Sequence, residues 1–261
     1  MPPHMPNHPC KALTQQQREF YHEKGWLMAE NVVSPAWIAR LRAATQRIVD
    51  DSRQLSESGS GINLWQGHSP ETPRLYDVSS PEDMQPGFWE FTSSQPMIDR
   101  VCDLLGPQVR YRYSTIRFRE LIPADLWHQD LPFDEIEGEG LAAAIHLHDT
   151  RIEHPHLQVI SGSQRGEVFT HLNDEGEFIG ELNAQEMKRI EGRDVVDVVG
   201  PAGSIEFIDY RVLHQDMWGG SERGGALLYL GFTALDAIPS EQPRYPDVPS
   251  SKRGEILTGS G

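Results

Sequence analysis

The feature that most constrains the fold of this chain is a change in sequence texture near Gln108. From there on, turns separate short segments rich in β-branched and aromatic residues, and the first segment, "VRYRYSTIRFREL", alternates as a strand does. Further strands are predicted at Leu141–His148, Leu157–Ile160, Val195–Val199, Ser204–Ile208, Val212–His214 and Ala226–Thr233. Short strands joined by turns, with helices mostly before them, favour a mainly β fold, an antiparallel double-sheet jelly roll with an N-terminal helical layer.

The helices are predicted mainly ahead of this point. Apolar spacing and capping signals place them at Gln15–Lys24, from Pro35 to about Ser52, at Ser94–Leu105 and, within the strand region, at Ala184–Glu191. Residues 53–90 are rich in Ser, Gly and Pro and are expected to be irregular, and loops of that length are often functional covers. Four aromatic residues in or near this segment are candidates for a lid: Trp65, Phe88, Trp89 and Phe91.

The whole chain fits a single domain with two tails. We expect the domain at 13–236, with the helical layer over about 13–106 and the jelly roll over about 107–236. Residues 1–12 are expected to form a disordered tail, and residues 237–261 a C-terminal tail along the surface.

Charge and cysteine content narrow the range of functions. The 39 acidic and 23 basic residues give a formal net charge of −16, which opposes binding to nucleic acid or to an anionic membrane. No secretory signal and no apolar run of membrane-spanning length are evident. Cys10 and Cys102 do not suggest a disulfide framework, so a reducing cytoplasm is the expected location. Oligomeric state cannot be read from the sequence.

The segment "LWHQDLPF", residues 126–133, carries the strongest chemical signal. It places His128 and Asp130 two residues apart at a predicted strand end, where both side chains point to the same side and can chelate one ion. Two imidazoles and one carboxylate hold one face of an Fe(II) ion and leave the opposite face open. The third ligand must then come from a distant strand, and His214, at the end of "SIEFIDYRVLH", is the leading candidate.

Taken alone, His-x-Asp is a weak signal in a chain with 11 histidines, and a solvated strand end explains it equally well. The downstream segment strengthens the metal interpretation, because Arg223 follows His214 and its guanidinium can pair bidentately with a carboxylate near the metal. A rival zinc or manganese site would be built from four other histidines: His146, His148, His154 and His156.

Three segments resemble a known family. "WHQDLPF", "LQVISGSQRG" and "VLHQDMWGGSERGGALLYLGF" are similar to the signature segments of the phytanoyl-CoA dioxygenase-like branch of the iron/2-oxoglutarate oxygenases. The resemblance extends diffusely from about Leu13 to Phe232. It implies a cupin-like double-stranded β-helix, with Fe(II) held by His128, Asp130 and His214. It also implies that Arg223 binds the distal carboxylate of the co-substrate 2-oxoglutarate.

The chain also departs from the family pattern. Ser161-Gly162-Ser163-Gln164 stands where the family often has Pro-Gly-Ser/Thr-His, and Asp216 stands where it often has a small hydroxyl residue. Gly225 lies two residues after Arg223, where no serine can share the carboxylate. We therefore nominate Thr115 and Arg117 as further 2-oxoglutarate contacts, although an exposed basic strand face is an equal alternative for them.

Three residues are candidates for the substrate pocket: Phe133, His146 and Trp218. Core packing explains the two aromatic residues at least as well. Asp130 fills the position that a small residue takes in halogenating relatives, so the resemblance implies hydroxylation or a related oxidation.

The expected reaction oxidises an unactivated C–H of a small molecule with O₂ and 2-oxoglutarate and releases succinate and CO₂. An amino-acid-like compound or a natural-product intermediate is the expected substrate. Two alternatives remain open at this point: a metal-dependent jelly-roll dioxygenase that does not use 2-oxoglutarate, and a non-catalytic small-molecule-binding protein on the same scaffold.

Overall fold

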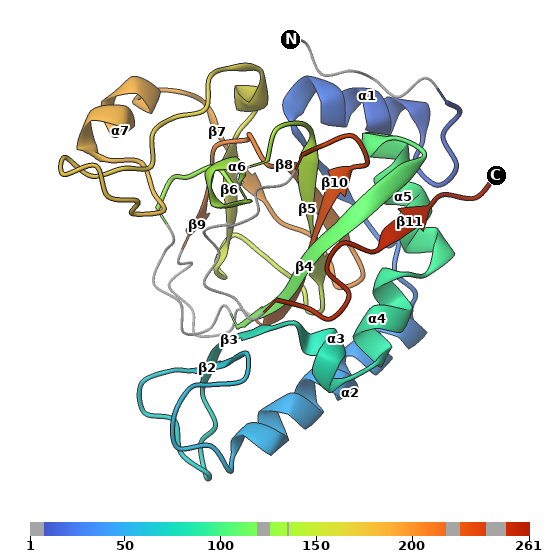
Figure 1. The fold of residues 1–261 in the computed structure, drawn as a ribbon, viewed down its shortest axis with the longest axis vertical. Coiled ribbons are helices and arrows are strands. Elements are labelled where there is room, and N and C mark those ends of the chain that lie inside the picture. Colours follow the sequence, from blue (N-terminus) through green and yellow to red (C-terminus); the bar gives the residue numbers. More distant parts are fainter. Residues whose placement is uncertain (1–7, 119–125, 135, 218–224, 239–248) are drawn as a thin grey trace.

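The computed structural model describes residues 8–118, 126–134, 136–217, 225–238 and 249–261 (Figure 1). The helices before the long strand are α1 (Gln15–Lys24), α2 (Pro35–Ser52), α3 (Pro81–Met84), α4 (Gly87–Thr92) and α5 (Gln95–Leu105). Those after it are α6 (Leu131–Asp134), the 3₁₀ turn η1 (Ser163–Arg165) and α7 (Ala184–Ile190). None of the described helices combines the length and the apolar composition that crossing a bilayer requires.

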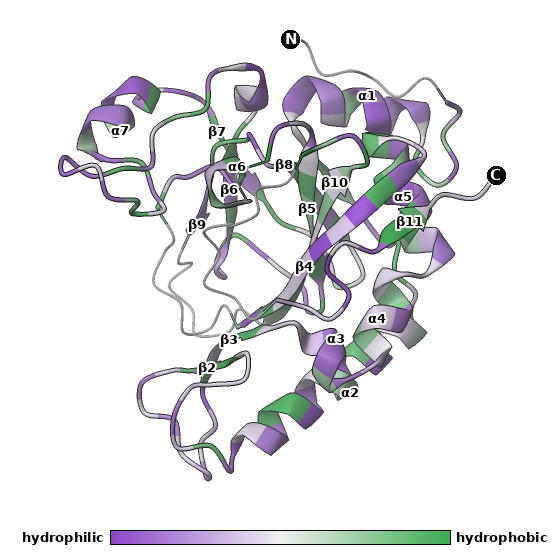
Figure 2. Ribbon diagram, in the orientation of Figure 1, coloured by the Kyte–Doolittle hydropathy of each residue, from purple (hydrophilic) through white to green (hydrophobic). Residues whose placement is uncertain are grey.

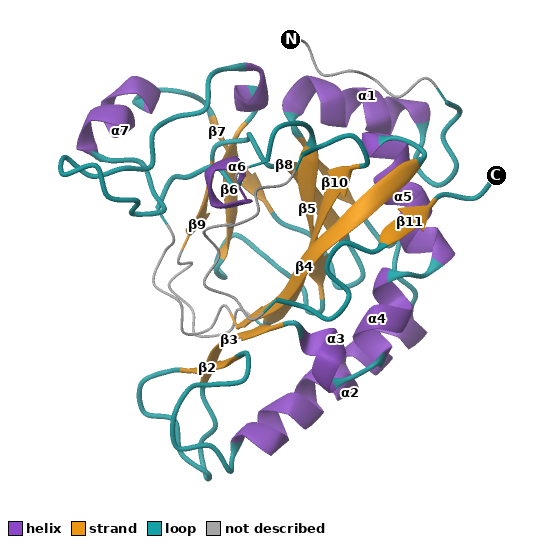
Figure 3. Ribbon diagram, in the orientation of Figure 1, coloured by secondary structure: helices purple, strands orange, loops and turns teal. Residues whose placement is uncertain are grey.

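The strands form two antiparallel sheets. The eight-stranded sheet has the order β1 (Trp26–Ala29), β8 (Ile205–Asp209), β5 (Gly140–His146), β10 (Ala226–Ala234), β4 (Gln108–Phe118), β3 (Leu75–Ser79) and β2 (Ile62–Leu64), and β11 (Ile256–Thr258) also pairs with β4. The three-stranded sheet has the order β7 (Val195–Val198), β6 (His156–Ile160) and β9 (His214–Met217). Figure 3 shows the strands at the centre and α2, α3, α4 and α5 along one side. This is the mainly antiparallel β fold with helices that the sequence predicts.

The main core lies between the large sheet and the helices. Alternate residues of β5, such as Leu141, Ala143 and Ile145, are fully buried against Leu41 and Ile98 from α2 and α5, within one large apolar cluster. All of β5 is buried, because its other face looks toward the small sheet. Figure 2 shows the consequence: β5 is coloured as apolar, whereas α1 and α7 are mostly hydrophilic. One face of the large sheet therefore packs against the helices, and residues of the other face line a cavity.

Predicted helix starts and stops agree with the structure. Thr14 and Gln17 form the expected capping box, and Gly25 ends α1 in the left-handed conformation with φ of 80°. A Cβ at Gly25 would come within 2.3 Å of Val212, so only glycine fits there. One strand is shifted: Val212–His214 was expected to be extended, but β9 begins at His214 and Val212 closes a turn with Asp209.

The prediction that residues 53–90 are irregular is wrong in part. This segment contains β2, β3, α3 and α4, and β3 pairs with β4 through Asp77, Val78 and Ser79. The strands are short and carry polar residues, so their alternation is too weak to be recognised in the sequence. Three of the four proposed lid aromatics pack in or against the main core. Phe88 and Phe91 belong to the main core, Trp89 packs edge-on against Tyr111, and Trp65 stacks on Tyr76.

Both predicted tails are in contact with the domain where the structure describes them. The buried Asp103 carboxylate accepts hydrogen bonds from the backbone N–H groups of Lys11, Ala12 and Leu13, and these tie residues 11–13 to α5. At the other end, β11 pairs with β4. Neither attachment has a local sequence pattern, because each depends on a partner roughly ninety or more positions away.

A buried carboxylate adds a second tie for the C-terminal segment. The side chain of Glu82 accepts hydrogen bonds from Tyr111, Ser114 and Ser250, all of them buried. Glu82 lies in the first turn of α3, and Ser250 lies six residues before β11. The three donors satisfy a carboxylate that would otherwise be costly to bury.

We expect Ser250→Ala to lower the free energy of unfolding by about 1.5–3 kcal/mol, the range for a hydrogen bond to a charged group. The neighbouring variant Ser251→Ala is the control, since Ser251 bonds Asp83 at the exposed surface. Urea unfolding followed by circular dichroism measures both variants. Equal, small effects would show that the Glu82 network does not hold the C-terminal segment.

Candidate metal centre

Two histidines lie side by side at the β9 edge of the small sheet. His128 and His214 form an antiparallel bridge in which the backbone N–H of each donates to the carbonyl of the other, at 2.9 and 3.0 Å. Their rings lie on the same side, with centroids 4.2 Å apart. Asp130, two residues after His128, points to that side as well. Its Oδ1 lies 3.9 Å from Nε2 of His128 and 3.6 Å from Nε2 of His214.

Hydrogen bonds fix which nitrogen of each imidazole faces the carboxylate. Nδ1 of His128 lies 2.7 Å from the carbonyl of Leu126, and Nδ1 of His214 lies 2.9 Å from that of Val212. A carbonyl only accepts, so each Nδ1 carries the proton and each Nε2 keeps its lone pair. Burial, with a contribution from nearby His214, lowers the pKa of His128 to about 4. The imidazole is therefore neutral at neutral pH, as a metal ligand must be.

These three side chains fit a metal ion. Their ligand atoms all lie within 4.8 Å of one another, and in the described part of the chain no other group of three or more His, Cys, Asp or Glu residues does so. The rival site is not formed there, because His146 and His156 each bond a carboxylate of their own, at Glu206 and Asp197. The sequence prediction of one convergent His-Asp-His cluster agrees with this arrangement.

A cavity of about 260 Å³ opens beside the cluster, between the two sheets. Three of the sequence-nominated residues line it together with the cluster: Thr115 and Arg117 from β4, and Phe133 from α6. β4 also contributes Tyr113, and the other walls come from β3, β5, β6, β8, β9 and β10: Tyr76, Asp77, Ala142, Leu157, Ile208, Asp216 and Tyr229. The cavity therefore joins strands that are far apart in the sequence.

Arg117 lies between two acidic residues in this cavity. Its Nη1 is 3.6 Å from Oδ2 of Asp216, and Asp77 is its cross-strand neighbour in the β3–β4 register. Asp77 is buried and accepts a hydrogen bond of 2.7 Å from Asn63. Sequence reasoning did not place Asp77 here, because β3 was not recognised as a strand. For Asp216 a signal existed: it lies two residues after His214 and so shares its strand face.

His146, which was predicted to lie in the substrate pocket, does not line this cavity. His146 is fully buried and faces the space between the sheets, but it lies four residues along β5 from Ala142, beyond the cavity. There it bonds the Glu206 carboxylate at 3.0 Å and the Thr150 hydroxyl at 3.0 Å. The remaining two nominated residues, Trp218 and Arg223, lie outside the described residues.

A jelly roll with two histidines and one carboxylate converging inside it defines a mononuclear non-haem metal enzyme of the facial-triad type. Residues 21–215 match the family model of phytanoyl-CoA dioxygenase (PhyH). The chain belongs to the phytanoyl-CoA dioxygenase family, and the predicted family and the predicted dioxygenase class are confirmed. No curated protein sequence matches the chain closely enough to count as a relative.

Solved structures share the fold. EctD from S. alaskensis with 2-oxoglutarate and 5-hydroxyectoine has a TM-score of 0.76 at 17% identity, over 98% of this chain and 92% of that one. EctD with bound Fe gives 0.73 at 16% identity, over the same shares of both chains. The α-ketoglutarate-dependent carbocyclase SnoK from nogalamycin biosynthesis gives 0.72 at 18% identity, over 94% of this chain and 97% of that one. These likenesses confirm the predicted jelly-roll fold.

Proposed function

We propose that this protein is an Fe(II)/2-oxoglutarate-dependent dioxygenase that hydroxylates, or otherwise oxidises, an unactivated C–H of a small molecule. The observation that carries the proposal is the convergence of His128, Asp130 and His214 at one end of the cavity. Family membership and the bound Fe and 2-oxoglutarate of the EctD structures support these cofactors. The free cysteines, Cys10 and Cys102, agree with a reducing, cytoplasmic location.

When bound, iron with 2-oxoglutarate and O₂ supplies the oxidising chemistry and releases succinate and CO₂. The chain supplies ligands and orientation. The two imidazoles, each fixed by a backbone carbonyl, would bind the metal through Nε2, and Asp130 would contribute the third ligand. Apolar walls at Leu157 and Ile208 exclude water, so that the oxidised position is set by how the substrate lies in the cavity.

The co-substrate is expected to be held by Arg223, with Thr115 and Arg117 as further contacts. Thr115 and Arg117 line the cavity, which supports the assignment. The guanidinium of Arg117 also lies near Asp216 and 5.8 Å from the centre of the Tyr229 ring. Arg117 therefore lines the cavity together with residues of β9 and β10.

We expect Arg223→Ala to weaken 2-oxoglutarate binding about a hundredfold, because a bidentate, charge-assisted pair is worth about 3 kcal/mol. Metal affinity is expected to stay unchanged. Anaerobic titration of the Fe(II) protein with 2-oxoglutarate measures the effect, and Arg151→Ala, at an exposed arginine, is the control. An unchanged affinity in Arg223→Ala would favour the alternative dioxygenase that does not use 2-oxoglutarate.

The cavity favours a small substrate with both positive and negative groups. Its volume of about 260 Å³ is below the range of roughly 300–1,000 Å³ common for ligand sites. Asp77 and Asp216 suit an amino group, Arg117 suits a carboxylate, and Tyr113 and Tyr229 suit either as hydroxyl donors or ring faces. An amino-acid-like compound, or a natural-product intermediate bearing such groups, meets these requirements.

The proposed function is tested in two steps with purified protein. Anaerobic addition of Fe(II) and 2-oxoglutarate is expected to give the weak metal-to-ligand absorption band of the complex, and His128→Ala is expected to lose it. A library of small zwitterionic metabolites is then screened for substrate-dependent succinate. A wild-type protein without the band, together with His128→Ala that binds iron as the wild type does, would contradict the proposal and favour a non-catalytic binding protein.

A further inference from the structure

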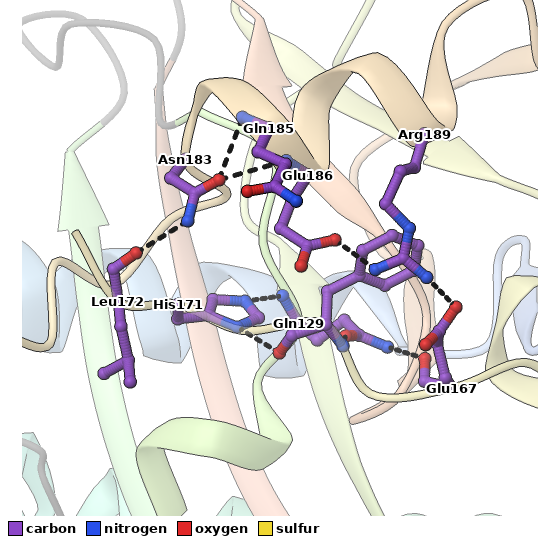
Figure 4. A network of polar contacts seen from close by, with 9 residues as sticks. Gln129, Glu167, His171, Leu172, Asn183, Gln185, Glu186 and Arg189 are labelled. Carbon is purple, nitrogen blue, oxygen red and sulfur yellow. Dashed lines mark hydrogen bonds and ion pairs between the residues drawn. The ribbon is translucent and has the colours of Figure 1, made fainter. Parts of the chain in front are cut away.

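Gln129, which lies between two of the predicted metal ligands, has its side chain and its backbone N–H all engaged. It is fully buried, and its side chain points away from those of His128 and Asp130. Its Oε1 accepts from the N–H of Phe169 at 2.8 Å, and its Nε2 donates to the carbonyl of Arg211 at 2.6 Å. Its backbone N–H donates to Nε2 of His171 at 2.9 Å (Figure 4).

His171 is an acceptor with a fixed tautomer. The N–H of Gln129 can only donate, so Nε2 of His171 carries the lone pair. Nδ1 of His171 lies 2.9 Å from the carbonyl of Phe169 and donates its proton there. The residue is 2% exposed, and the hydrogen bonds at both ring nitrogens hold the ring in this orientation. Nε2 of His171 therefore accepts the backbone N–H of Gln129, as the carbonyl of a neighbouring strand would in a sheet.

The segment around His128 is held on both of its edges. One edge pairs with His214 through both backbone groups of His128. The other edge faces the insert between β6 and β7: the carbonyl of Trp127 accepts from the N–H of Leu182 at 2.8 Å, and the N–H of Gln129 donates to His171. Successive residues of an extended segment turn their backbone groups to opposite edges, which explains this division.

Hydrogen bonds and ion pairs within the insert stabilise it, so it can hold this edge of the segment around His128. Asn183 caps α7 by accepting from the N–H groups of Gln185 and Glu186, and it donates to the carbonyl of Leu172 at 2.8 Å (Figure 4). Arg189 of α7 contacts Glu186 and Glu167 at the start of the insert. The insert thus connects a surface helix to the backbone of the metal-binding segment.

We propose that His171 is a positioning residue for the metal centre: by accepting the Gln129 N–H it sets the backbone angle at which His128 and Asp130 converge. This rests on the proposed function only in that the three ligands bind a divalent metal. Loss of the acceptor leaves a buried N–H unpaired, and the segment relieves this by rotating. A rotation there moves both ligands away from His214, because the ligands flank the rotated residue.

The test uses Co(II) alone as the probe, with affinity and the visible absorption spectrum as readouts. His171→Phe keeps a ring of similar size and removes the acceptor, whereas His171→Gln keeps an acceptor near the same place. We expect His171→Phe to weaken Co(II) binding by about 10–100-fold, as loss of an outer-shell partner does, and to alter the spectrum. His171→Gln is expected to regain most of the affinity. Asn173→Ala, which removes turn contacts of the same insert, is expected to bind Co(II) as the wild type does.

Each outcome decides between the two proposals. A wild-type protein that does not bind Co(II) overturns the metal centre itself. Tight wild-type binding with equally tight binding by His171→Phe overturns the positioning role alone. An equal loss in Asn173→Ala also overturns it, because then any disturbance of the insert suffices. Thermal unfolding verifies that each variant is folded. If His171→Phe is not, His171→Leu, which also removes the acceptor of the Gln129 N–H, is measured by the same criteria.

Discussion

Asp130→Ala is expected to lose metal binding and, with it, substrate-dependent succinate formation. The variant leaves two imidazoles whose Nε2 atoms face a gap, with no carboxylate charge to balance the ion. Removing one of three protein ligands should cost more than the roughly 10–100-fold that loss of an outer-shell partner costs. Titration with Co(II) measures the affinity, and succinate release measures the turnover.

The matched control is Asp216→Asn, an acidic residue of the same cavity that bonds Arg117 and not the histidines. It is expected to keep Co(II) affinity close to that of the wild type, although it weakens the ion pair with Arg117. A parallel loss of Co(II) affinity in both variants would show that general negative charge, and not ligation by Asp130, holds the metal. Retained affinity in Asp130→Ala would place the metal elsewhere.

The site could be predicted from the sequence to the extent that it depends on local spacing. His128 and Asp130 share a face because they are two residues apart, and His214 follows a recognisable strand. The sequence prediction and the structure differ where the position of a residue depends on strand register. His146 has the correct orientation but lies too far along β5, a difference that the pairing of β5 with β8 and β10 defines. Asp77 could be assigned to the site only if β3 was recognised as a strand, and the pairing of β3 with β4 has no local sequence signal.

The fold shows the same difference between structure that local sequence predicts and structure that depends on long-range strand pairing. Helices with caps, such as α1, are defined by residues next to one another, so their bounds were predicted well. The strands that were missed, β1, β2, β3 and β11, are short and acquire their structure by pairing with β8, with β4 or with each other. The role of His171 is of this second kind, because it pairs with a backbone group 42 positions away.

The buried pair of His146 and Glu206 is expected to have the largest effect on stability. Both side chains are fully buried on adjacent strands, 3.0 Å apart, and Oε1 of Glu206 has no hydrogen-bond partner among the described residues. The carboxylate accepts from Nε2, while Nδ1 accepts from Thr150. We expect His146→Leu to lower the free energy of unfolding by about 3–5 kcal/mol, because it leaves a buried carboxylate without a partner.

The double variant His146→Leu/Glu206→Leu separates burial of a charge from loss of packing. Replacing both members of a buried pair by apolar groups is often neutral, so the double variant should regain most of the stability that the single variant loses. Urea unfolding of both variants measures this. A single variant within about 0.5 kcal/mol of the wild type would show that the pair is not important for stability. Because the pair lies beyond the cavity and outside the His-Asp-His cluster, the folded double variant should bind Co(II) as the wild type does.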